Sequence, residues 1–454
     1  MKSTQQTFDH RSTAYLPDYH RPFLNSVTLP KLVQACWAAY DPEGFFFSIS
    51  SRTSRDFFTV ELPGFSTIHV TGSANGAKEL MSAPPQVFKM LTGSPIDSVL
   101  GPNSMMVKDG KKHQRQRKMI MPCLGPGPMK SLKKSFAKVA IDALSSMQVP
   151  SETNLADLMQ DLTLSIVVET IFGVQDQDFK KKFCKTIKEF VSLTTPSLLL
   201  IPNLRSKAWP PWRKFLRAQA KLDACLFEQI SKLKQSPEDG NACVIKTMML
   251  AKDENGQALS LEELRDELRT LIVAGHETTA MAMTWAFYYI LIHPKIYAKV
   301  MHEINSCKSL LDDSMPFLDA VFKEALRIKA IPPFAFRTLG QDYSILNHQL
   351  KAGDNVALSM ILLHHDERVF KNPRKFIPER FLDHEFGAYE FLPFGSGARR
   401  CIGSYFAQTE MRILAAYLLK GAKFELLSKK APRLVLRHIN AGPDRPIHIR
   451  IIKK

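Results

Sequence analysis

The sequence lacks the features that would place the protein in a membrane or outside the cell. No run approaches the ~20 apolar residues of a membrane span. The most apolar stretch, 280–292, is thirteen residues long and contains Thr284. The first 30 residues are polar, include three prolines, and have no apolar core of signal-peptide length. These absences predict a soluble, cytoplasmic protein with no transmembrane anchor.

The sequence has few cysteines, and their spacing does not suggest disulfide pairs. The seven are scattered, odd in number, and form no Cys-x-x-Cys motif. That spacing argues against a disulfide framework and a structural zinc site, and it favours a reducing compartment. Zinc-finger spacing and glycine-aromatic RNA-binding patterns are also absent, so nucleic acid is not an expected partner despite a formal charge of +17. The excess charge is either an ordinary solvated surface or an attraction to an acidic protein or anionic substrate group.

The composition is otherwise that of a globular protein. The chain has 454 residues, 45% of them hydrophobic, which is ample material for a core. Length alone would allow up to three domains. Local patterns predict strands at 56–62 and 66–71, helices at 73–82, 110–118 and 405–419, a helical region at 151–235 broken by a proline-rich loop at 194–212, and strands at 434–437 and 447–452.

The longest periodic pattern begins after Ser260 and stops before Pro294. Glu263 stands at the capping-box position. The pattern corresponds to a helix of about 33 residues, roughly 50 Å long. Its second half is apolar on nearly every face, so this helix should cross the core.

A polar cluster at 274–279 interrupts this apolar helix. Buried polar groups cost free energy unless they are paired, so the cluster indicates either a satisfied network or chemistry. His276 followed by Glu277 could begin a zinc-protease motif. That motif requires a second histidine at position 280, which is Ala280, so this interpretation fails.

The segment 394–403 places Cys401 in a loop punctuated by glycines, just before an apolar helix. Gly395, Gly397 and Gly403 allow tight or left-handed turns and the close approach of a flat partner. A helix N-terminus and neighbouring arginines favour a thiolate, which is a strong ligand for iron. A lone cysteine also often serves only in packing.

The loop resembles the haem loop of the cytochrome P-450 family, the haem-thiolate monooxygenases, in soluble bacterial-type form. Its five fixed residues match Phe-x-x-Gly-x-Arg-x-Cys-x-Gly. Other family-like segments follow in the family's order: the Gly-x-Glu-Thr cluster on the long helix, Glu-x-x-Arg, Pro-x-x-x-Arg, and the meander at 364–381. The residues that carry the resemblance are Phe394, Gly397, Arg399, Cys401 and Gly403 in the loop, with Gly275, Glu277, Thr278, Glu324, Arg327, Pro333, Arg337 and Arg380 elsewhere.

The resemblance implies a fold and a cofactor. The fold is mainly α with a small β-rich lobe, formed as a single domain over 1–454, in which the long central helix crosses a haem-containing core. Residues 1–55 are poorly diagnostic. The cofactor is haem b with Cys401 as its axial thiolate and metal ligand, within the haem loop 394–403. Residues implied to bind the cofactor are His113 (in place of the family's usual Trp), Arg117, Arg337, Phe394, Arg399, Cys401 and Gly403.

The resemblance also implies an activity and partners. Glu277 and Thr278 would relay protons as one oxygen atom of O2 enters a C–H bond or alkene of a hydrophobic lipid, terpenoid, steroid or polyketide. Only 53 residues follow Cys401, so electrons should come from a separate ferredoxin or flavodoxin. No oligomer is expected, and the 194–212 loop is the one segment that could touch a membrane. Segments expected to line the substrate pocket are 88–100, 194–204, 271–279, 331–336 and 439–441; residues expected to help dock the donor are Lys111, Lys112, Arg115 and Arg400.

Two alternatives stay open at this point. One is a peroxide-using haem hydroxylase or isomerase, and the other is a non-catalytic haem-binding redox sensor. Members of these kinds usually lack the acid–alcohol pair that Glu277 and Thr278 supply. The resemblance also implies a structural triad, in which Glu324 is joined to Arg327 and Arg380.

Overall fold

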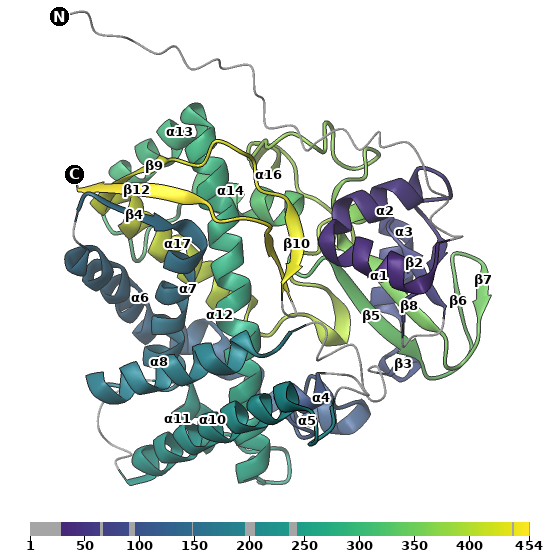
Figure 1. Cartoon of the computed structure of the whole chain (residues 1–454), viewed down its shortest axis with the longest axis horizontal. Coiled ribbons are helices and arrows are strands. Elements are labelled where there is room, and N and C mark those ends of the chain that lie inside the picture. The colour runs from purple at the N-terminus through teal and green to yellow at the C-terminus, as the bar shows by residue number, and fades with distance from the viewer. Residues whose placement is uncertain are drawn as a thin grey trace, which may run out of the picture.

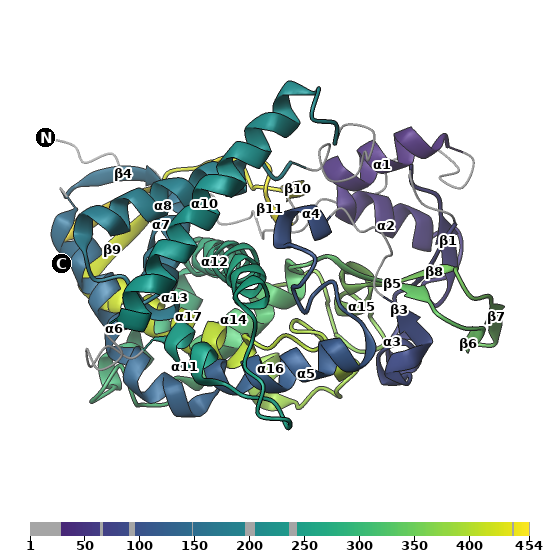
Figure 2. The ribbon, with the colours of Figure 1, turned by 90° about the horizontal axis from the view of Figure 1, so that it is seen from below.

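The computed structural model of the chain describes residues 29–63, 67–89, 96–147, 149–195, 205–235, 243–437 and 440–453. One long helix, α12 (Leu261–Ile292), runs through the helical part of the molecule, and the β-rich lobe lies to one side of it (Figure 1). Seen along its axis, α12 lies near the centre, surrounded by other helices (Figure 2). The predicted mainly α fold with a small β-rich lobe is confirmed.

The central helix begins and ends where the sequence predicts. The Ser260 hydroxyl accepts from the Glu263 backbone N–H at 3.1 Å, and the Glu263 carboxylate accepts from the Ser260 N–H at 2.9 Å. This capping box satisfies two donors that the first helical turn would otherwise leave unpaired. His293 ends the helix, and Pro294 opens the next one. Helix α12 packs against α7 and α14, so it crosses the core as expected.

The helices that surround α12 come from along most of the chain. Helix α17 packs on α6, and α8 packs on α10. The remaining helices with their bounds are α1 (Lys31–Tyr40), α2 (Pro42–Ser50), α3 (Ala74–Ser82), α4 (Asp97–Leu100), α5 (Gly110–Ile120), α6 (Pro126–Ser146), α7 (Leu155–Ile166), α8 (Gln177–Ser192), α10 (Pro210–Gln235), α11 (Val244–Leu250), α13 (Pro294–Ser306), α14 (Pro316–Ile328), α15 (Met360–His364), α16 (Arg380–Asp383) and α17 (Ser404–Gly421).

Four small sheets are present in the described ranges. The largest has the order β1-β2-β8-β5-β3, with β2 and β8 parallel and the other pairs antiparallel. The others pair β4-β12-β9, β10-β11 and β6-β7. The strands are β1 (Phe58–Val60), β2 (Ile68–Thr71), β3 (Phe88–Lys89), β4 (Ser151–Asn154), β5 (Phe334–Leu339), β6 (Tyr343–Ile345), β7 (His348–Leu350), β8 (Asn355–Ser359), β9 (Ala422–Leu426), β10 (Leu434–Arg437), β11 (Asn440–Pro443) and β12 (His448–Lys453).

Two local predictions need correction. Pro210 to Trp212 was assigned to a loop but forms the first turn of α10, because proline lacks an N–H where a helix start has no partner for one. Trp212 is buried. Near the C-terminus the sequence predicts strands only at 434–437 and 447–452, whereas Gly442 and Pro443 between them belong to β11 and pair with β10. The apolar patch 198–201, with its predicted membrane contact, lies outside the described residues.

The predicted buried triad is present. Arg327 donates to Glu324 through Nε at 2.7 Å and Nη2 at 2.9 Å, and Arg380 Nε donates to the same carboxylate at 3.2 Å. Arg327 Nη1 also donates to the carbonyl of His364 at 2.7 Å. Glu324 and Arg327 are fully buried. The triad therefore fastens α14 to the meander that leads to the cysteine loop.

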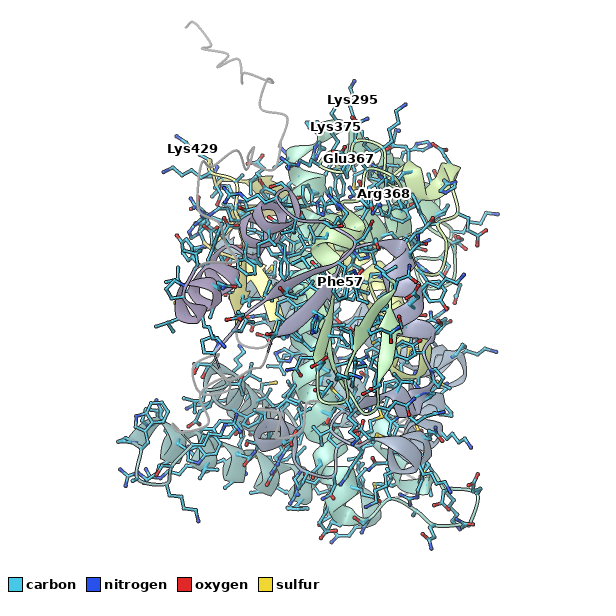
Figure 3. The ribbon with its side chains drawn as sticks, turned by 90° about the vertical axis from the view of Figure 1, so that its right-hand side faces the viewer. Phe57, Lys295, Glu367, Arg368, Lys375 and Lys429 are labelled. Carbon is cyan, nitrogen blue, oxygen red and sulfur yellow. The ribbon has the colours of Figure 1, made fainter. Side chains whose placement is uncertain are left out.

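The meander is also tied to the β-rich lobe. Arg368 pairs with Asp366 at 2.7 Å and with Asp56, next to β1, at 2.8 Å. Glu367, Arg368 and Lys375 lie close together in the side view, with Phe57 of the lobe below them (Figure 3). Among the described helices, none has the length and apolar character needed to span a bilayer.

Candidate functional site

The cysteine loop is held by its own backbone. The N–H of Cys401 donates to the carbonyl of Phe394 at 2.9 Å, which closes the loop just before α17. Gly395 and Gly397 have φ of 66° and 65°, the left-handed values predicted for them. At Gly397 a Cβ would also stand 2.3 Å from the carbonyl oxygen of Met81. Gly403 lies in the tight turn before α17, as predicted, with a φ of −87° that is open to any residue.

The Cys401 side chain is exposed, although protein surrounds the loop that carries it. Burial of the surrounding region raises the pKa of the Cys401 thiol, and the Gly403 N–H, Arg117 and Arg400 only partly oppose that rise. The Gly403 N–H at the start of α17 and the two arginines thus favour the thiolate, as predicted, but burial outweighs them and the net pKa of the thiol is raised. Desolvation of an anion outweighs the attraction of two partly exposed cations.

Helix α12 presents one open face within its buried length. From Asp266 to Ile290 every side chain is buried except those of Ala274, Gly275 and Thr278. Residues at i, i+1 and i+4 share a helix face, so exposed Ala274 and half-buried Gly275 and Thr278 form one partly open stripe in the middle of a buried helix. The helix continues through Gly275 without a break.

Glu277 and Thr278 have different partners in this structure. The Thr278 hydroxyl donates to the Ala274 carbonyl at 2.6 Å. The Glu277 carboxylate is buried and accepts from Nδ2 of Asn440, on β11, at 2.9 Å. Both residues lie where the sequence predicts, on one turn of α12, but no direct bond joins them. Sequence reasoning placed 439–441 near the pocket and did not identify Asn440 as a partner of Glu277.

A group of basic side chains lies together near the cysteine loop. Burial and, to a smaller extent, the positive charges of Arg399, Arg117 and Arg337 together lower the pKa of His113 to about 4. Arg117 also interacts electrostatically with Cys401. The structure thus brings His113, Arg117, Arg337, Arg399 and Cys401 to one place, as predicted.

This group carries more positive charge than its neighbours neutralise. Arg399 pairs with Asp109 at 2.6 Å. Arg337 donates to the Phe336 carbonyl at 2.7 Å, and burial together with Arg399 lowers the pKa of Arg337 to about 10. In the described part of the chain the Arg117 guanidinium has no hydrogen-bond or ion-pair partner. Crowded, partly buried cations of this kind favour an anionic group beside them.

The residues around the cysteine loop suit haem in shape and in chemistry. A Cβ placed on Gly395 or Gly403 would meet no protein atom within 4 Å, so the backbone is open to a flat group there. The donor set is one accessible thiol, three arginines and one neutral imidazole. A thiol is a ligand for iron and arginines bind carboxylates, so the residues fit an iron porphyrin with two propionates.

Not every predicted functional segment is placed. Residues 90–95, 196–204 and 439 lie outside the described residues, so those parts of the expected pocket lining are not located. Phe334 and Phe336 are half-buried, whereas Leu271 to Val273 are buried. Residues 271–273 therefore pack in the core and do not form an open wall.

The predicted donor-docking residues divide into two groups. Lys111, Lys112 and Arg400 are exposed. Arg115 instead pairs with Asp253 at 2.5 Å and Glu263 at 3.0 Å, so its charge is neutralised within the chain. Two acids, from the start of α12 and the segment before it, hold Arg115 in place, and its docking role stays a prediction.

Comparison with known proteins gives a consistent family assignment. A family model described as Cytochrome P450 matches residues 36–446. "Putative cytochrome P450 135A1" of Mycobacterium tuberculosis is 28% identical over 90% of each chain. Cytochrome P450 26B1 of Danio rerio is 27% identical over 90% of this chain and 83% of its own.

Solved structures show the same fold. Retinoic acid-bound cyanobacterial CYP120A1 superposes with a TM-score of 0.80 at 24% identity, over 90% of this chain and 94% of that one. The haem domain of cytochrome P450DA gives 0.79 at 21% identity, over 93% and 95%. The predicted family resemblance is confirmed. The chain belongs to the cytochrome P450 family, the haem monooxygenases whose members carry haem b with an axial cysteine thiolate.

Proposed function

We propose that the chain inserts one oxygen atom of O2 into a C–H bond or alkene of a hydrophobic substrate, with electrons from a separate ferredoxin or flavodoxin. The observation that carries this proposal is that the Cys401 thiol and the basic group around His113 lie close together in the fold. The Cys401 thiol, the basic group around His113 and the open face of α12 come from distant parts of the sequence, and the first two meet at one place. We assign all of them to a single domain.

Each residue of the basic group has a defined task. Cys401 would hold the haem iron as a thiolate, and the Phe394 carbonyl fixes the Cys401 backbone. Arg117, Arg337 and Arg399 with the neutral His113 would bind the propionates through N–H donors. The open backbone at Gly403 allows the flat group to lie close. When bound, the haem supplies the oxygen-activating chemistry, and its thiolate donates electron density that favours O–O cleavage.

Two residues of α12 are placed to transfer protons. The Thr278 hydroxyl lies on the open face, where it holds a proton at Oγ1 and now directs it to the Ala274 carbonyl. Glu277 is held one residue away by Asn440. A side-chain rotation of Glu277 from Asn440 toward Thr278 would complete an acid–alcohol relay, as general-acid catalysis requires.

Replacing Thr278 by alanine tests this relay. We expect product formation to fall on the order of 100-fold, because the proton donor on the open face is lost. Consumption of NADH should continue, with its electrons appearing as peroxide. The measurement compares product, NADH and peroxide for a substrate found by spin-state titration with fatty acids, terpenoids and retinoic acid.

Thr284→Ala is the matched control, since Thr284 makes the same bond to the carbonyl four residues earlier, at 2.7 Å, but is fully buried. Thr284→Ala should keep product and peroxide near wild type. Unchanged coupling in Thr278→Ala would remove the relay assignment. It would favour a peroxide-using enzyme or a redox sensor, the two alternatives to a dioxygen-activating monooxygenase.

A hydrophobic substrate is supported by the open parts of the described pocket segments. Phe334, Ala335 and Phe336 of β5 are half-buried, and Ala274 is exposed on the open face of α12. Aromatic and aliphatic side chains of this kind line apolar ligand sites. The bound retinoic acid named for the cyanobacterial structure makes an apolar carboxylic acid a suitable first probe. A reducing, cytoplasmic location stays a prediction.

The electron donor should bind where the cysteine loop reaches the surface. A hollow of about 420 Å³ there is lined in part by Phe394, Ser396, Arg400 and Lys323. Arg400 and Lys323 are exposed. A positively charged rim around the shortest path to Cys401 suits an acidic ferredoxin or flavodoxin.

Charge reversal at Arg400 tests this docking surface. We expect Arg400→Glu to slow reduction by an acidic donor roughly tenfold at low salt, and to weaken the salt dependence of the wild-type rate. Stopped-flow reduction at increasing salt measures both. Lys214→Glu, which changes an exposed residue near the start of α10, should keep the wild-type rates. A wild-type reduction rate that does not change with salt concentration would contradict the electrostatic account.

A further inference from the structure

The segment 101–109 lies between the long helix and the cysteine loop and is held from both sides. It follows α4 and precedes α5, and four consecutive residues within it, Asn103 to Met106, are buried or half-buried. No family-like motif falls on it. Its hydrogen bonds nevertheless reach α12 on one side and Arg399 on the other.

Two buried acids of α12 hold the backbone of this segment. Asp266 Oδ2 accepts from the Asn103 N–H at 2.9 Å, and Glu267 Oε1 accepts from the Met105 N–H at 2.5 Å. Asp266 and Glu267 are 0% and 1% exposed. A buried carboxyl without such donors would be costly, so these bonds fix the segment on the helix.

Side chains and backbone shape strengthen the same contact. The hydroxyls of Ser104 and Thr270 are 2.6 Å apart and both residues are buried. Gly101 has φ of 97°, and a Cβ there would stand 2.2 Å from Cγ of Asp266. The start of the segment therefore lies directly against α12, where only glycine fits.

Arg399 holds the other side of the segment. Its Nη1 donates to the Met105 carbonyl at 3.0 Å, and its Nη2 donates to the Lys108 carbonyl and to Asp109 Oδ1, the latter at 2.6 Å. Met105 thus receives Arg399 at its carbonyl and gives its N–H to Glu267. One residue links the long helix to the cysteine loop.

We infer that Glu267 is a positioning residue, which sets the place of the Arg399 guanidinium beside the haem propionates through Met105. This inference rests on the proposed binding of a propionate by Arg399. If Met105 shifts, Arg399 loses one of its three acceptors, and its charge moves relative to the cofactor. The long helix, which carries the proposed proton relay, is thereby coupled to the cofactor's electrostatic surroundings.

The protonation of Glu267 decides which substitution preserves the bond. Burial raises the pKa of Glu267 to about 8, while the Met105 N–H opposes that rise and the neighbouring acids Asp266 and Glu263 add to it. Near pH 7 the carboxyl is therefore mostly neutral and accepts through its carbonyl oxygen. Glutamine has the same shape and the same acceptor, so Glu267→Gln should retain the contact, whereas Glu267→Leu should remove it.

The test compares haem retention and reduction potential in the holoenzyme. We expect Glu267→Leu to lose haem to apomyoglobin about tenfold faster than wild type, because the contact between the displaced Arg399 guanidinium and the haem propionate is weakened. Its reduction potential should fall, since a positive charge near the haem favours the reduced, more negative state. Glu267→Gln should restore both values.

A double-mutant cycle separates positioning from general destabilisation. Arg399→Gln should shift the potential the same way, and Glu267→Leu should add nothing to it, because both act through one guanidinium. Glu303→Leu is the matched control. Glu303 also holds backbone N–H groups, those of Phe317 and Leu318 at 2.8 Å, but lies on α13 away from Arg399. It should leave the potential unchanged.

Each outcome bears on one claim. Additive shifts in the double mutant, or a wild-type potential in Glu267→Leu, would overturn the positioning role. A wild-type potential and haem-loss rate in Arg399→Gln would instead overturn the proposed propionate contact. If Glu267→Leu does not fold, Thr270→Val removes the Ser104 bond and should give a smaller shift in the same direction; no shift would again contradict the inference.

Discussion

Replacing Cys401 by alanine should abolish product formation while leaving the fold intact. The Cys401 side chain is exposed, so its removal costs little packing energy. The axial thiolate, by contrast, is the group that drives O–O cleavage, and no neighbouring side chain of the cysteine loop can replace it. Turnover with the natural or a surrogate donor measures the activity, and far-UV circular dichroism measures the fold.

The control for this variant is Cys36→Ala. Cys36 is also exposed but lies on α1. Its replacement should leave turnover unchanged. Residual product formation by Cys401→Ala above the level of free haem would mean that another residue holds the iron.

Replacing Glu324 by glutamine should destabilise the protein by about 3–5 kcal/mol. Glu324 is fully buried and accepts from Arg327, Arg380 and the N–H of Ile377. Without its charge, the fully buried Arg327 and the half-buried Arg380 lose their counter-ion. Since whole domains are stable by about 5–15 kcal/mol, much of the variant should be unfolded or aggregated at 37 °C.

Urea denaturation monitored by circular dichroism checks this expectation. Glu262 provides the control, because it has the same three-residue spacing to Arg265 but is exposed at the start of α12. Glu262→Gln should change the unfolding free energy by no more than about 0.5 kcal/mol. Equal midpoints for the two variants would show that the triad contributes nothing particular to stability.

Features encoded within a few residues could be predicted from the sequence. The start and end of α12 follow from Ser260, Glu263 and Pro294, and the turns of the cysteine loop follow from Gly395 and Gly397. These patterns are local, so no tertiary contact is needed to interpret them.

Features that depend on partners distant in sequence could not be predicted. The bond from Asn440 to Glu277 joins residues 163 positions apart, and the pairing of Arg115 with Asp253 joins residues 138 apart. Each partner alone has an ordinary local context. The raised pKa of Cys401 was missed for a related reason: the sequence shows nearby arginines, but desolvation depends on the packed fold.

The most direct test of the account is the spectrum of the purified, reduced protein with carbon monoxide. The central claim is that Cys401 holds haem iron as a thiolate, with the basic group around His113 on its propionates. The account predicts the strongly red-shifted Soret band of thiolate ligation in wild type and its loss in Cys401→Ala. A Soret band in the position typical of histidine ligation, or a red-shifted band that survives in Cys401→Ala, would contradict it.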